Sequence, residues 1–147
     1  MSAYDEAEVG EILRRRGWRA AFTVTERVNA WAVLVSSVER GYRDDIYEYT
    51  NDLYCRNWLH EAWLLLPDHV VQLWTPRIQT LDDRFRAATI ADDGLALDQF
   101  HRVPHYDMWW WRRHPRVFVG SLGRSLRSAG AVGTDPKSPD ACRAGGL

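Results

Sequence analysis

The sequence has few cysteines and no long apolar run. Its 147 residues include two cysteines, too few for a disulfide framework, so we expect a reduced chain that is held together by its core. The apolar stretch at residues 62–66 is far too short to cross a bilayer, which predicts no membrane-spanning helix. The first residues have neither a basic stretch nor a long apolar run, so no signal peptide is expected. Together these absences favour a cytoplasmic protein.

The sequence also lacks the short motifs that mark common catalytic and metal sites. It contains no His-Glu-x-x-His pair and no glycine-rich phosphate loop. Cys55 has only His60 near it in sequence, and on a helix these two side chains point about 140° apart, too far for a nucleophile–base pair. We therefore predict no catalytic residue, no metal site and no cofactor.

Composition and length fit one globular domain. Hydrophobic residues make up 46% and charged residues 27% of the chain, which is ordinary for such a domain. The charge is unevenly spread, with five basic against eleven acidic side chains in residues 42–98 and seven against two in residues 112–147. We expect the acidic middle and the basic end either to pair with each other or to face different partners.

The spacing of apolar residues predicts an all-α fold. Three main antiparallel helices are expected near residues 24–40, 44–66 and 68–89, with a weaker helix at 5–16. The first helix is the weaker prediction because Gly10 costs about 1 kcal/mol relative to alanine within a helix.

Local signals refine these helices. Thr23 and Glu26 have the spacing of a capping box, which places a helix start between them. Pro76 predicts a kink or a division into two shorter helices. Asp82 and Arg86, four residues apart, are expected to form an ion pair on the helix surface.

The predicted core follows from the same periodicity. Residues 58–66 are apolar nearly all round, so this end of the third segment should be deeply buried. The expected buried stripes are Val24, Val28, Trp31, Ala32, Val35 and Val38 on one helix, and Tyr42, Ile46, Tyr49, Leu53, His60 and Leu64 on the next.

The C-terminal part has no sustained period. We expect residues 1–119 to form a single helical domain in which residues 90–119 are an irregular, aromatic-rich segment covering the helices. Residues 120–147 are rich in Gly, Ser, Ala, Pro and Arg, which predicts a disordered basic tail that the fold does not need.

Three consecutive tryptophans followed by two arginines are the most distinctive feature of the chain. On a regular element, three adjacent side chains cannot all face one core. We therefore expect at least one of Trp109, Trp110 and Trp111 to be accessible and, together with Arg112 and Arg113, to bind a partner.

Histidines and carboxylates leave a second class of function open, a small metal-dependent or histidine–carboxylate enzyme. His60, His101, His105 and Asp107 are the residues on which it would depend. Pro104 prevents His101 and His105 from acting as helical ligands four residues apart, which argues against a metal centre.

A third alternative is nucleic-acid binding through the Trp- and Arg-rich C-terminal segment, where bases can stack on indoles. The isoelectric point near 6.5 argues against it. The leading interpretation is a non-enzymatic protein–protein interaction module, whose partner is another protein or a second copy of the chain.

The basic residues are 18 arginines and one lysine, and residues 81–89 read Leu-Asp-Asp-Arg-Phe-Arg-Ala-Ala-Thr. Over residues 24–116, the arginine bias, this segment and the three tryptophans together resemble the sequences of small proteins from GC-rich actinobacteria. The resemblance implies a bacterial protein and no particular activity.

Overall fold

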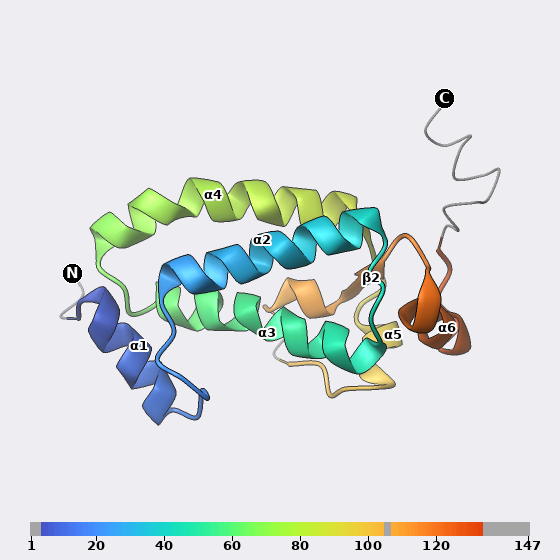
Figure 1. Cartoon of the computed structure of the whole chain (residues 1–147), viewed down its shortest axis with the longest axis horizontal. Coiled ribbons are helices and arrows are strands. Elements are labelled where there is room, and N and C mark those ends of the chain that lie inside the picture. Colours follow the sequence, from blue (N-terminus) through green and yellow to red (C-terminus); the bar gives the residue numbers. More distant parts are fainter. Residues whose placement is uncertain (1–3, 105–106, 134–147) are drawn as a thin grey trace.

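The structure, a computed structural model, describes residues 4–104 and 107–133. Within these residues the fold is mainly helical, which confirms the all-α prediction. The helices α2 (Val24–Arg40), α3 (Ile46–Trp63) and α4 (Asp68–Ala87) lie side by side along the long axis, each running opposite to the one before it (Figure 1).

Capping residues explain where the main helices begin. The Thr23 hydroxyl accepts a hydrogen bond from the Glu26 backbone N–H at 3.2 Å, and the Glu26 carboxylate accepts one from the Thr23 N–H at 3.0 Å. The predicted capping box is therefore present. Asp45 caps α3 in a similar way, accepting a hydrogen bond from the Glu48 N–H at 2.8 Å.

The core lies between α2, α3 and α4 and includes most of the predicted stripe residues. Leu64 is an exception, because its side chain is 81% exposed. The expectation that Leu64 is buried is wrong because Leu59 and Ala62 form the buried face at this end of α3. At 100° per residue, Leu64 points to the opposite side of the helix.

Helix α4 continues through Pro76 as one element. Of the two outcomes that Pro76 predicts, the division into two shorter helices is wrong, and the kink stays a prediction. Ile78, Leu81 and Phe85, which follow the proline, are all buried. Their packing into the core stabilises the second half of the helix and offsets the backbone hydrogen bond that proline removes.

Helix α1 (Glu6–Arg15) lies across the end of the α2–α3 pair (Figure 1). Gly10 is buried where α1 meets the loop that leads into α2. A Cβ atom at this position would lie 2.6 Å from the carbonyl oxygen of Phe22. The glycine that weakens the helix locally is thus required for its close approach to the loop.

The segment 90–119 is less irregular than predicted. The strands β1 (Thr89–Ala91) and β2 (Arg113–Pro115) pair in antiparallel fashion. Between them lie the short helix α5 (Leu95–Asp98) and the 3₁₀ turn η1 (Trp109–Trp111). Pairing of β1 with β2 brings the tryptophan cluster back to the end of α4. The two strands are separated by more than twenty residues of sequence, so no local sequence pattern predicts their pairing.

Helix α6 (Gly120–Ser128) corrects the prediction of a disordered tail from residue 120. Leu122 and Leu126 are four residues apart, share one helix face and are both buried. The helix packs against α3. The only apolar residues of this helix are its two leucines, which stand among Gly, Ser and Arg. The composition of the segment therefore does not predict a helix. Residues 134–147, which were also assigned to the tail, lie outside the described residues.

Candidate functional site

The three tryptophans form η1, a single 3₁₀ turn. Such a turn has three residues, so successive side chains point about 120° apart. Trp110 and Trp111 are 1% and 0% exposed, whereas Trp109 is half-buried. The geometric prediction that the three indoles cannot all be buried in one core holds, and Trp109 is the one that keeps accessible surface.

Asn57 on α3 holds the two buried indoles in place. Its side-chain oxygen accepts hydrogen bonds from the indole N–H groups of Trp110 at 2.6 Å and Trp111 at 2.8 Å. One amide oxygen has two lone pairs and can accept both bonds. Sequence reasoning missed Asn57, because a single asparagine within an otherwise apolar helix end carries no signal of its distant partner.

A buried ion pair lies beside Trp110. The Arg56 guanidinium is 4.5 Å from the centre of the Trp110 ring and donates two hydrogen bonds to Asp82, both 3.0 Å long. Asp82 also accepts a hydrogen bond from the Trp31 indole at 3.0 Å. Each charge is thereby compensated, as a buried pair requires. The indole of Trp110 packs against the guanidinium of this ion pair.

Arg86 pairs with a different residue from the predicted one. The expected Asp82–Arg86 pair is wrong because Asp82 points into the core, and Arg86 lies 3.4 Å from the Asp83 carboxylate instead. The Arg86 guanidinium carbon lies 3.9 Å from the centre of the Trp109 ring. Phe85 supports the same indole edge-to-face, with the ring centres 6.0 Å apart.

The two arginines that follow the tryptophans hold the two-stranded sheet in place. Arg112 lies 3.0 Å from the Asp93 carboxylate. Arg113 donates hydrogen bonds to the Thr89 hydroxyl at 2.7 Å and to the backbone carbonyls of Arg86 and Thr89 at 3.1 and 3.2 Å. A cation among the last carbonyls of a helix stabilises that end. Both arginines therefore have structural partners, and the exposed arginine that lies on the half-buried Trp109 is Arg86.

His60 and Asp107, two residues of the enzyme alternative, do come together. The His60 Nε2 atom lies 3.5 Å from an Asp107 carboxylate oxygen, and the imidazole packs edge-to-face on Trp110. This pair lies at the rim of the tryptophan cluster.

His101 has different neighbours. Its ring stacks on Trp111 at 5.0 Å, and its Nε2 atom is 3.1 Å from the Tyr54 hydroxyl. His105 lies outside the described residues. Within the described part of the chain, no three side chains of metal-ligating types converge on one point.

No protein-family model, no curated protein and no solved structure matches the chain. Among the described helices, none combines the length and the apolar character needed to span a bilayer. The tryptophan cluster and its neighbours are therefore the features of this chain from which a function can be inferred.

Proposed function

We propose that the protein is a non-enzymatic interaction module of the bacterial cytoplasm and that it binds a protein partner through the surface around Trp109. The placement of Trp109 carries this proposal. It is the one member of the cluster that is not buried, and Arg86 stacks on its face. Tryptophan and arginine are the residue types that contribute most to binding free energy at protein interfaces.

The Trp109 surface consists of Trp109, Arg86, Asp83, His60 and Asp107. Its members are linked by the contacts described above, from the Asp83–Arg86 pair through the indoles to the His60–Asp107 pair. An aromatic centre with a charged rim is the arrangement typical of a binding patch.

A second copy of the chain is the partner that this surface fits. The rim carries a guanidinium and carboxylates, with Arg86 next to Asp83 and with Asp107 next to His60, which packs on Trp110. In a two-fold dimer, the same patch meets itself, so each copy can place its cation against an anion of the other. We therefore propose self-association through the Trp109 surface.

The test compares alanine variants by sedimentation equilibrium and by thermal melting. Trp109→Ala is expected to weaken self-association by about tenfold or more, as interface hot spots do, with a small loss of stability. Trp110→Ala and Trp111→Ala should instead destabilise the fold by about 3–5 kcal/mol, because both indoles are buried. Trp74→Ala, a half-buried indole elsewhere on α4, is the matched control and should leave association unchanged.

Two results would count against the proposal. A wild-type chain that stays monomeric up to high micromolar concentration rules out the second copy as partner. Association that Trp109→Ala leaves intact rules out this surface.

A further inference from the structure

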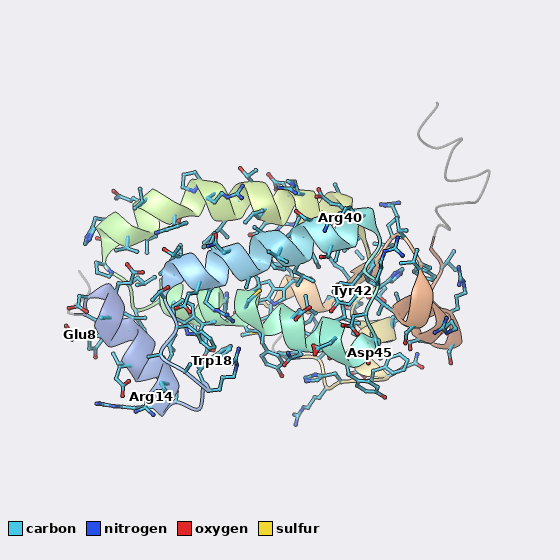
Figure 2. The ribbon with its side chains drawn as sticks, viewed as in Figure 1. Glu8, Arg14, Trp18, Arg40, Tyr42 and Asp45 are labelled. Atoms are coloured by element: carbon cyan, nitrogen blue, oxygen red, sulfur yellow. The ribbon has the colours of Figure 1, made fainter. Side chains whose placement is uncertain are left out.

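A groove of about 830 Å³ lies between the loop that follows α1 and the helices α2 and α3. Figure 2 shows Trp18 in this loop, near the place where the three helices meet. The volume is within the range of small-molecule sites in proteins. None of the groove residues belongs to the Trp109 surface, so the groove is a separate feature of the molecule.

Aromatic side chains form one wall of the groove. The Trp18 ring packs edge-to-face on Phe22 and on Tyr54, with ring centres 6.5 and 6.2 Å apart. The Trp18 indole N–H donates a hydrogen bond to Glu61 at 2.9 Å, which fixes the orientation of the ring. A flat apolar group entering the groove would therefore meet a preformed aromatic surface.

Two guanidinium groups converge on the same wall. The guanidinium carbon of Arg27 lies 3.9 Å from the centre of the Phe22 ring, and that of Arg19 lies 5.1 Å from it. Burial is the main cause that lowers the pKa of Arg27, and the nearby Arg19 charge lowers it further, while Cys55 and Glu26 act in the opposite direction. The two guanidinium groups thus bring positive charge to a partly buried part of the groove.

Arg27 has no acceptor for its side-chain N–H groups within the described residues. Its Nε atom is buried without a hydrogen-bond partner, and its guanidinium forms no ion pair with any described side chain. A buried donor left unmatched costs free energy, which an added acceptor would recover. Arg27 is therefore the group in the groove that most needs a ligand oxygen.

The acidic residues of the groove are engaged elsewhere. The Glu26 carboxylate accepts the hydrogen bond from the Thr23 backbone in the capping box. The Asp52 carboxylate accepts a hydrogen bond from the Tyr42 hydroxyl at 2.7 Å. Neither forms a salt bridge with Arg27 in the described part of the chain. The groove is lined by three arginines, Arg16, Arg19 and Arg27, against these two carboxylates, so its lining carries a net positive charge.

Cys55 lines the groove but is not suited to react with a ligand. The thiol is buried, and burial raises its pKa to about 12. It is therefore protonated at neutral pH, and only the thiolate is a good nucleophile. The groove therefore offers side chains that can bind a ligand but no nucleophile at Cys55.

We infer that the groove binds a small organic anion in which a carboxylate or a phosphate ester is attached to a flat apolar ring. Arg27 and Arg19 pair with the oxyanion, because guanidinium groups match the geometry of both anions. The ring packs against Trp18 and Tyr54, the two half-buried aromatic side chains of this wall. This inference goes beyond the proposed interaction function, and neither depends on the other.

The first experiment uses four probes on the full chain: naphthoate, naphthyl phosphate, neutral naphthamide and inorganic phosphate. Proton–nitrogen NMR spectra follow the indole signal of Trp18 and the Nε–H signals of the arginines during each titration. Both naphthyl anions are expected to shift the Trp18 and Arg27 signals and to bind about tenfold or more tightly than naphthamide, because a charged hydrogen bond is added. Their order of affinity identifies the preferred head group.

A pair of variants on α2 tests the role of the cation. Arg27→Met keeps a long stem over Phe22 but removes the charge, so naphthoate affinity should fall about tenfold or more. Arg40→Met is the matched control, since Arg40 lies at the opposite end of the same helix (Figure 2) and should leave affinity unchanged. Melting curves check folding, and Arg19→Met, at an exposed position, replaces Arg27→Met if that variant does not fold.

Three outcomes would overturn the inference. Naphthyl anions that bind no more tightly than naphthamide show that charge is not recognised. Inorganic phosphate that binds as tightly as naphthyl phosphate shows that the ring is not recognised. Unchanged affinity in a folded Arg27→Met or Arg19→Met variant shows that the anion binds elsewhere.

Discussion

At the scale of single residues, Asn57 decides where a distant segment lies. Its side-chain oxygen binds the indole N–H groups of Trp110 and Trp111, more than fifty residues later in the chain. Arg56, the preceding residue, stacks on Trp110 and pairs with Asp82. Adjacent residues on α3 thus satisfy the polar groups that the buried cluster brings into the core, as buried polar groups require.

Asn57→Ala should therefore cost about 2–5 kcal/mol of unfolding free energy, because two buried indole N–H groups lose their acceptor. The measurement is urea denaturation followed by circular dichroism. Asn51→Ala, an exposed position on the same helix, is the control and should change stability by less than about 0.5 kcal/mol. Equal effects of the two substitutions would show that the shared acceptor contributes nothing.

At the scale of elements, α6 shows that a helix can be stabilised by docking more than by composition. Its sequence contains two glycines and three serines, which favour a helix less than alanine or leucine does. Leu122 and Leu126 are nevertheless buried, and Gly123 lies so close to Phe118 that a Cβ atom would be 2.9 Å from its carbonyl carbon. Tertiary packing supplies the stability that local propensity lacks.

Leu126→Ala is accordingly expected to destabilise the protein by about 2–5 kcal/mol, since a fully buried leucine leaves a cavity. Thermal melting measures the change. Arg124→Ala, exposed on the same helix, serves as the control and should melt like the wild type. If the Leu126 variant also melts like the wild type, then α6 does not stabilise the body of the fold and these residues are dispensable.

At the scale of the whole molecule, one core connects the helices from α1 to α6. Buried side chains of all the longer helices belong to a single cluster, from Val9 on α1 to Leu126 on α6. The basic end and the acidic middle of the chain also compensate each other in part within the fold, because Arg112 pairs with Asp93. A shared core predicts that the described elements unfold together.

Leu53→Ala tests this cooperativity, because Leu53 is fully buried in the middle of α3. The substitution should lower stability by about 2–5 kcal/mol. Unfolding curves from far-ultraviolet circular dichroism and from tryptophan fluorescence should still coincide. Tyr47→Ala, at a 65% exposed position on the same helix, provides the control. Two separate transitions would contradict a single core.

Three helices were predictable because their signals are local. The Thr23–Glu26 capping box and the apolar stripes depend on residues within a few turns of one another, so they can be recognised without knowing the fold. The prediction failed where distant partners decide the outcome. Asp82 was assigned to Arg86 by spacing, but in the fold it faces Arg56 and Trp31. Pro76 does not divide α4, because the residues that follow it are buried in the core.

The sequence by itself determined the helical class, the main helices and the fact that three adjacent indoles cannot all be fully buried. Only the tertiary structure decided that Trp109 is the accessible indole, that Arg112 and Arg113 hold the β1–β2 pair, and that Arg27 and Arg19 meet over Phe22. The physical reason is the range of the interactions. Periodicity and caps act within a few residues, whereas burial and the pairing of polar groups depend on which distant segments the folded core brings into contact.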